Sequence, residues 1–346
     1  MLFSHKTHGF FVELNNYGVL LARTSAKSCP MMVEAFKICP GNDAEALGAA
    51  LAEIHPKRRG GAFIHAKCGL YPAKRLVRRA TLEPKRYKED GYLNDVVNSQ
   101  FRVEPEKFTL AILNPGNGAD FDLGSAVDKD ALFVGMANDE ISEAQALLVS
   151  KGIFPDRLEL TTVATLGAIG DYLQFANIST PTLVLEIDTD STQSFILSST
   201  GVDSTRPIPQ GLNAMIPIVQ KELGLKDEES ARKLFYSNTF DFTGMGSVLT
   251  KKLLKELQSS IGFYEVQTGQ SIGQVICTML PSKLGWLETA IANQLGVGLL
   301  KIDYTTWLQS RGISFDGKAM AAEVDSRWLG LVSLMLTNHV TPAEKK

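Results

Sequence analysis

Cysteine is scarce in this sequence, and long apolar runs and a strong net charge are missing. The 346 residues include only four cysteines, Cys29, Cys39, Cys68 and Cys277, and no CxxC pair. Their wide spacing argues against a zinc site and a disulfide framework, so we expect reduced thiols. Because 35 Lys and Arg residues stand against 38 Asp and Glu residues, the formal charge of −3 excludes a globally basic protein, and we expect no nucleic acid partner.

Apolar runs long enough to cross a membrane do not occur. No stretch reaches about 18 consecutive apolar residues. The first residues lack a basic start followed by an apolar segment, so we expect no signal peptide. With 44% hydrophobic and 21% charged residues, the chain can bury a sizeable core. These features predict a cytoplasmic protein of two domains, or of one domain with an insertion.

The common motifs of catalytic and cofactor sites are absent as well. The sequence has no G-x-S-x-G, no G-x-x-x-x-G-K-[ST] and no G-x-G-x-x-G. The histidines have no partner at i+4 and no accompanying acid pattern, so we expect no metal site among them: His5, His8, His55, His65 and His339.

Two halves of the sequence follow the same plan. In the first half, residues 10–14 and 18–22 predict two strands joined by a turn at Asn15 and Asn16, which tolerate left-handed backbone. A strand, a helix and a further strand are expected after them. In the second half, three strand patterns, at 182–187, 192–198 and 203–208, are followed by helices and by another strand. This repetition indicates an α/β protein built from a duplicated unit.

One segment of the first half has a different composition. Residues 57–88 contain eleven Lys or Arg residues and one acid, Glu83. Helix and strand patterns alternate from there to about residue 152, where Gly152 ends a helix. We therefore predict an α+β domain inserted into the larger α/β body.

Four stretches carry a resemblance to a known family. They are LEIDTDST at 185–192, RPIPQG at 206–211, KELQSSIGFYEVQTG at 255–269, and the strand, helix and return-strand pattern of 131–173. In order and spacing they resemble the PilM family, FtsA-like proteins of type IV pilus assembly in the actin-like ATPase superfamily. The resemblance covers nearly the whole chain.

The resemblance implies a two-lobed actin-like (ribonuclease H-like) α/β fold with an inserted α+β domain of the FtsA/PilM type. The expected division gives the first lobe residues 1–69 and 153–180, with the insertion at 70–152. The second lobe is expected at 181–316, including a small helical subdomain at 221–269. A C-terminal helix at 317–340 is expected to return to the first lobe, and a tail follows at 341–346.

In such a fold, two β-hairpin turns with the pattern D-x-G grip the phosphates of ATP, because glycine lets backbone N–H groups approach them. Here the first turn reads Glu13-Leu14-Asn15-Asn16, without the glycine. The second reads Glu186-Ile187-Asp188, with Asp190, Thr192 and Gly211 following. Like charges about 4 Å apart cost on the order of 1 to 4 kcal/mol, so the acids disfavour a polyphosphate.

The adenosine side also departs from the family pattern. Relatives carry a Gly-Gly pair after the strand that precedes the last helices, whereas this chain has Thr278-Met279-Leu280-Pro281. We therefore expect a lost nucleotide site, no cofactor, and binding instead of catalysis. ATP with Mg²⁺ is the disfavoured alternative.

Other interpretations of the acids stay open. Glu13, Glu186, Asp188 and Asp190 could together hold a divalent cation that restores phosphate affinity, or they could be exposed turn residues. The alternative functions are an active ATP-binding protein whose nucleotide state regulates pilus assembly, and a sugar- or acyl-phosphate kinase on the same fold.

The resemblance also implies a partner, the N-terminal tail of a single-span PilN-like membrane protein, held in a groove between the first lobe and the insertion. We place this groove near five apolar residues: Leu70, Tyr71, Leu76, Phe154 and Leu158. The chain would act as a cytoplasmic scaffold of a type IV pilus or type II secretion-like platform. It would be held at the inner membrane by this partner and by other platform proteins.

The basic segment offers a second contact. The segment could be a solvated face of the insertion, or it could contact an anionic membrane surface or an acidic partner. The residues concerned are Lys74, Arg75, Arg78, Arg79, Lys85, Arg86 and Lys88.

Overall fold

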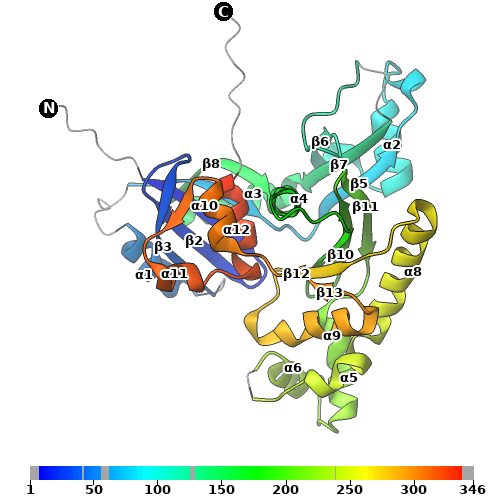
Figure 1. Cartoon of the computed structure of the whole chain (residues 1–346). Coiled ribbons are helices and arrows are strands. Elements are labelled where there is room, and N and C mark those ends of the chain that lie inside the picture. The colour runs from blue at the N-terminus through cyan, green and yellow to red at the C-terminus, as the bar shows by residue number, and fades with distance from the viewer. Residues whose placement is uncertain (1–7, 41–42, 56–61, 125–128, 238, 337–346) are drawn as a thin grey trace, which may run out of the picture.

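The computed structural model describes residues 8–40, 43–55, 62–124, 129–237 and 239–336, which form three β-sheets (Figure 1). The sheet of the first lobe has six strands in the order β14-β3-β2-β1-β4-β8. Helix α1 (Ala44–Ile54) packs on β2 and β3 and begins at Asp43, whose side chain accepts hydrogen bonds from two backbone N–H groups of the first turn. The strands are β1 (Gly9–Asn15), β2 (Gly18–Thr24), β3 (Met31–Cys39), β4 (Ile64–Leu70), β8 (Ile153–Leu160) and β14 (Ile313–Phe315).

The second lobe repeats this plan with a five-stranded sheet in the order β11-β10-β9-β12-β13. β9 pairs antiparallel with β10 and parallel with β12, as β1 pairs with β2 and β4 in the first lobe. The strands are β9 (Thr182–Ile187), β10 (Thr192–Ser198), β11 (Gly201–Ile208), β12 (Gln274–Thr278) and β13 (Gly298–Leu299). The helices are α5 (Ile216–Glu222), α6 (Glu228–Phe235), α7 (Gly246–Leu249), α8 (Lys251–Thr268) and α9 (Gly285–Leu295).

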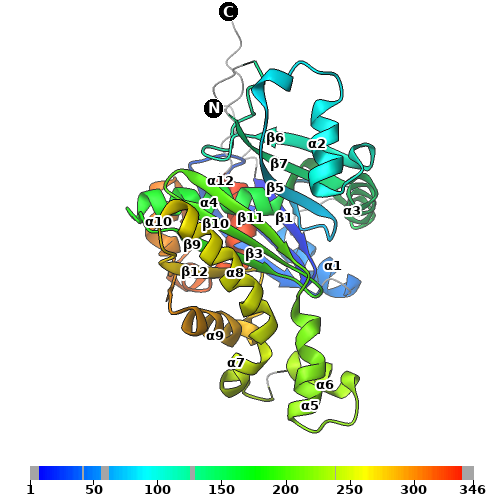
Figure 2. The ribbon, with the colours of Figure 1, turned by 90° about the vertical axis from the view of Figure 1, so that its right-hand side faces the viewer.

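The third sheet is the inserted one, with strands in the order β5-β7-β6. It consists of β5 (Arg75–Thr81), β6 (Phe108–Leu113) and β7 (Asp130–Ala137), and α2 (Tyr92–Phe101) packs on it. The side view places this sheet and α2 at the opposite end of the molecule from α5 and α6 (Figure 2). β5 follows almost directly after β4, and its first residue, Arg75, contacts Glu186 of the second lobe, so the insertion starts where the two lobes meet.

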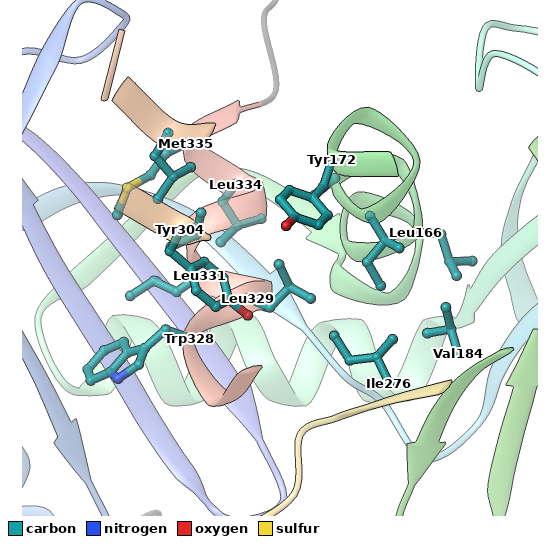
Figure 3. Packing of buried hydrophobic residues seen from close by; sticks show 14 of the residues in the cluster. Leu166, Tyr172, Val184, Ile276, Tyr304, Trp328, Leu329, Leu331, Leu334 and Met335 are labelled. Atoms are coloured by element: carbon teal, nitrogen blue, oxygen red, sulfur yellow. The ribbon is translucent and has the colours of Figure 1, made fainter. Parts of the chain in front are cut away.

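Two helices, α4 (Thr161–Phe175) and α12 (Leu329–Leu336), lie between the sheets of the lobes. Tyr172 of α4 points toward Leu334 of α12, and Leu166 lies toward Val184 and Ile276 of the second lobe (Figure 3). One cluster of buried apolar residues joins these helices to both sheets. The two lobes therefore share a core, and the hydrophobic effect holds them together.

Some expected boundaries differ from the structure. β14, which the sequence division assigned to the second lobe, pairs with β3 in the first-lobe sheet. Leu148 of α3 (Asn138–Ser150), assigned to the insertion, is buried in the first-lobe core beside Leu47 and Ile153. In both cases burial against a distant strand overrides the local sequence pattern.

The expected C-terminal helix of residues 317–340 is interrupted. It consists of α11 (Lys318–Ala322) and α12, because Asp325 accepts a hydrogen bond from the backbone N–H of Arg327 and starts a new helix. α12 packs on β1 and β4, so it does return to the first lobe. Residues 337–340 and the predicted tail at 341–346 lie outside the described residues. Within the described part of the chain, no helix combines the length and apolar character needed to cross a bilayer.

Candidate functional site

The turn between β1 and β2 is organised by Asn15. Its Oδ1 accepts hydrogen bonds from the backbone N–H groups of Tyr17 (2.9 Å) and Gly18 (3.1 Å). Its Nδ2 donates to Oε1 of Glu13 (2.8 Å). Glu13 is 1% exposed, and burial raises the pKa of its carboxyl to about 8. The carboxyl is therefore mostly neutral at pH 7, which makes it a poor ligand for a cation.

The turn between β9 and β10 is held by local hydrogen bonds and by the close approach of the chain at Gly211. The backbone N–H of Thr189 donates to Oδ1 of Asp188 (2.7 Å), and Oγ1 of Thr192 donates to the carbonyl of Gln210 (2.7 Å). A Cβ on Gly211 would lie 2.5 Å from the carbonyl oxygen of Asp188, so this position requires glycine. Gly211 thus brings a neighbouring chain segment against the turn.

Asp190 points away from this buried side. It is exposed, and its Oδ1 accepts a hydrogen bond from Nδ2 of Asn213 (2.8 Å). Arg232 of α6 in turn donates to Oδ1 of Asn213. Asp190 therefore belongs to a surface network, apart from the buried carboxyl groups of Glu13 and Glu186.

The two turns touch each other directly. Nδ2 of Asn16 lies 2.5 Å from Oδ1 of Asp188, and the hydroxyl of Tyr17 donates to the carbonyl of Ile187 (3.3 Å). These contacts join the first lobe to the second at the point where the β1–β2 and β9–β10 hairpins face each other. The space between the turns is thereby bridged by side chains.

Arg75 occupies the buried side of this junction. Its side chain is 1% exposed, its Nη2 lies 3.2 Å from Oε2 of Glu186, and its Nη1 lies 3.8 Å from Oδ2 of Asp188. Nη1 also donates to the carbonyl of Pro72 (2.9 Å), and Thr162 of α4 donates to the same Oε2 of Glu186 (2.8 Å). The guanidinium compensates acids that would otherwise repel each other.

Two further arginines of β5 also reach the second lobe. Arg78 is half-buried, and its Nη1 donates to Oε1 of Gln193 in β10 (3.2 Å). Burial lowers the pKa of Arg78 to about 10, so it stays charged at neutral pH. Arg79 donates from Nη1 to the carbonyls of Val202 (3.0 Å) and Asp203 (2.8 Å), and from Nη2 to Asp130 of β7 (2.9 Å).

The basic segment therefore does not form one surface patch. Arg75, Arg78 and Arg79 turn inward, because each finds acceptors on the second lobe that compensate its burial. Lys74, Lys85 and Lys88 are exposed, and Lys74 pairs with Asp139 (2.9 Å). Arg86 pairs with Glu89 within its own turn (2.8 Å). The exposed charges are fewer than the sequence suggested.

The chain after β12 fills the space beside the sheet with side chains. Met279 and Leu280 are buried, at 6% and 5% exposure. Met279 adopts a positive φ of 68°, a left-handed conformation that glycine adopts without strain. This position thus has the backbone conformation that favours glycine, but a methionine with a buried side chain occupies it.

Two adjoining cavities form a groove along α4. One has a volume of about 660 Å³ and lies between α4, the loop of residues 114–118 and the hairpin of β10 and β11. The other, of about 580 Å³, lies between α4, β8, the inserted strands β6 and β7, and α12. Both are lined by Leu113, Asn117, Gly118, Val163, Gly167 and Asp171. We call these joined cavities the α4 groove.

The expected partner residues are placed differently. Leu70, Tyr71 and Leu76 are 2%, 4% and 3% exposed, so they lie one layer beneath the surface. Leu158 lines the α4 groove, and Phe154 is 45% exposed near the start of the same strand, β8. The sequence signal for the groove lies instead in α4, where Gly167 and Gly170 recur at helical spacing and have no neighbour within 4 Å of a Cβ.

Within the described residues, no group of three or more His, Cys, Asp or Glu side chains is arranged to hold a metal ion. Glu13, Glu186 and Asp188 approach one another, but Arg75 stands among them and Asp190 points elsewhere. The donor set therefore does not favour the divalent cation that the acids had suggested as one alternative.

No protein-family model and no curated protein sequence matches the chain. A solved "PilM-PilN type IV pilus biogenesis complex" matches with a TM-score of 0.66 and 16% identity, over 96% of this chain and 98% of that one. The ethanolamine utilization protein EutJ from Carboxydothermus hydrogenoformans matches with a TM-score of 0.48 and 10% identity, over 96% and 90% of the chains. The cytoplasmic domain of EpsL from the type II secretion system of Vibrio cholerae matches with a TM-score of 0.43 and 13% identity, over 96% of each chain.

The chain has the actin-like ATPase fold. The resemblance to PilM that the sequence suggested is confirmed at the level of the fold.

Proposed function

We propose that this chain is a docking protein of a type IV pilus or type II secretion-like assembly platform, and that it works by binding instead of by ATP turnover. In this proposal, its partner is the extended N-terminal tail of a PilN-like membrane protein. That partner and other platform proteins hold the chain at the cytoplasmic face of the inner membrane. The fold shared with a PilM structure solved together with PilN supports the choice of partner.

The α4 groove is the proposed docking site. Its floor is the open face of α4, where Gly167 and Gly170 leave the helix backbone accessible to a ligand. Leu113 and Val163 supply apolar surface, and Asp171, paired with Arg311 (2.8 Å), supplies polar groups. An apolar channel with a few fixed polar groups suits a short extended peptide.

β8 offers a second feature for such a peptide. In the described structure it is the last strand of the six-stranded sheet, and residues 157–160 line the groove. An edge strand presents backbone N–H and C=O groups that an extended chain can pair with. Backbone pairing would supply affinity, while the apolar groove would select side chains.

The observation that carries the non-catalytic half of the proposal is the position of Arg75. It meets Glu186 and Asp188 from within the chain, while Asn16 bridges the two turns. These residues, together with Met279 and Leu280, do not fit a triphosphate gripped by bare backbone. We therefore propose that no ATP is bound and no phosphoryl transfer occurs.

Calorimetry tests the proposal that the chain docks a tail. The ligand is a synthetic peptide with the N-terminal sequence of the PilN-like protein encoded by an adjacent gene. We expect saturable binding of the tail and no binding of a scrambled peptide of the same composition. If the authentic tail gives no heat, or binds no better than the scrambled one, the proposed partner is wrong.

Titration of the same protein with ATP and Mg²⁺ tests the other half. We expect no heat up to millimolar nucleotide. Micromolar affinity would instead favour the rival function, an actin-like protein whose nucleotide state regulates pilus assembly. The two titrations are independent, so one half of the proposal can fail while the other stands.

A further inference from the structure

β5 connects the groove wall to the second lobe. It pairs with β7, and β7 pairs with β6, so the three strands form one sheet. The end of β6 at Leu113, and the loop of residues 114–118 that follows it, form the wall of the α4 groove opposite α4. Contacts that hold β5 in position therefore also hold the wall of the α4 groove in position.

The arginines of β5 bind three neighbouring strands of the second lobe in turn. Arg75 contacts β9 at Glu186, Arg78 contacts β10 at Gln193, and Arg79 contacts β11 at Val202 and Asp203. The strand order of that sheet is β11-β10-β9, so the contacts follow β5 across the sheet. We call Arg75, Arg78 and Arg79 the arginine clamp.

Val202 holds the wall at a second point. Its carbonyl accepts the hydrogen bond from Arg79 (3.0 Å), and its N–H donates to the carbonyl of Pro115 in the wall loop (2.9 Å). The adjacent Gly201 has a φ of 112°, and a Cβ there would collide with Pro115, so glycine is required for this approach. Arg79 of β5 and Pro115 of the wall loop are thus both hydrogen-bonded to one residue of the second lobe, Val202.

We propose that the arginine clamp positions the wall of the α4 groove, so that the second lobe sets the geometry of the docking site without a nucleotide. In two-lobed proteins in general, hinge closure around a ligand can change surfaces far from that ligand. Here the chain's own guanidinium groups join the inserted sheet to the second lobe. The consequence for tail binding rests on the proposed function, whereas the consequence for the wall does not.

Hydrogen exchange of the full chain tests the wall directly. In Arg79→Met, which keeps the side-chain length but loses the hydrogen bonds to β11 and Asp130, we expect faster exchange in residues 108–118. Arg86→Met is the matched control, because Arg86 lies in the same basic segment but its contacts, with Glu89 and with the ring of Tyr92 (4.4 Å), lie within the insertion. If Arg79→Met leaves exchange in residues 108–118 as slow as in the wild type, the clamp does not position the wall.

Tail binding by the same variants tests the functional consequence. We expect affinity to fall about tenfold in Arg79→Met, to recover partly in Arg79→Lys, and to be unchanged in Arg86→Met. Wild-type affinity in an Arg79→Met protein with a loosened wall would overturn the role in docking. If the wild type binds no tail at all, the proposed function fails, and the exchange measurement alone decides on the clamp. Arg79→Lys keeps the charge and serves both measurements if Arg79→Met does not fold.

Discussion

The side-chain amide of Asn16 lies 2.5 Å from a carboxylate oxygen of Asp188, although 172 residues separate the two along the chain. Each residue sits in the turn of one hairpin, and the two hairpins are equivalent elements of the two lobes. The resemblance noted in the sequence assigns phosphate binding to these two turns. Here the two turns are joined by a hydrogen bond from an amide to a carboxylate. Such charge-assisted hydrogen bonds are stronger than those between neutral groups.

Asn16→Ala should lower the free energy of unfolding by about 1 kcal/mol, because it removes a charge-assisted hydrogen bond between the lobes whose donor residue, Asn16, is exposed to water. Urea denaturation followed by circular dichroism measures this change. Asn94→Ala, an exposed position on α2, is the control and should have no destabilising effect. Equal stability of the two variants would mean that the contact between the turns contributes nothing to closure.

Arg75→Met should cost more, about 3–5 kcal/mol, because it leaves the buried carboxylates of Glu186 and Asp188 without a positive partner. The double variant Arg75→Met with Glu186→Gln should regain much of the loss, since the amide no longer carries the uncompensated charge. Lys74→Met, which removes the neighbouring exposed charge, serves as the control and should change little. A double variant no more stable than Arg75→Met would show that the pairing of Arg75 with Glu186 is not the cause.

The lobes, their repeated strand plan and the position of both turns follow from the sequence, because alternating apolar strands and turn residues are local signals. The contacts within the site do not. In the sequence, Asn16 and Asp188 are two turn residues that depart from the D-x-G pattern. Only the packing of two hairpins far apart in the sequence brings them together. The sequence shows that the turn glycines are missing, but it does not show that the side chains of Asn16 and Asp188 contact each other across the two turns.

The buried arginines of β5 could not be predicted for a related reason. Its sequence RLVRRAT sits in the basic segment, and arginine is usually exposed, so we interpreted its charges as a surface feature. The structure buries Arg75 because the acceptors that compensate it come from residues more than a hundred positions away. Charge alone cannot distinguish a surface patch from an internal clamp.

Glu13 should make stability depend on pH. Its pKa is raised from 4.5 to about 8 in the folded protein, so the native state holds this proton more tightly than the unfolded state. That contribution is fully present below pH 4.5 and is lost as the pH rises toward about 8. The stability of Glu13→Gln relative to the wild type should therefore increase across this window, as measured by urea denaturation at several pH values. A difference that stays constant with pH would contradict the buried, protonated carboxyl.

Gly167→Leu should block docking without harming the fold. A Cβ at this position would meet nothing within 4 Å, so a larger side chain can project into the α4 groove. Replacing a helical glycine should also stabilise the helix by roughly 0.5 kcal/mol. We expect the affinity for the PilN-like tail to fall at least about tenfold, as measured by calorimetry, with no loss of thermal stability. Gly48→Leu is the matched control, because Gly48 is an equally open helical glycine on α1, away from the groove. Since both variants add the same side chain to a helix, a selective loss in Gly167→Leu places the tail on α4. Equal affinities of the two variants would place the tail elsewhere on the molecule.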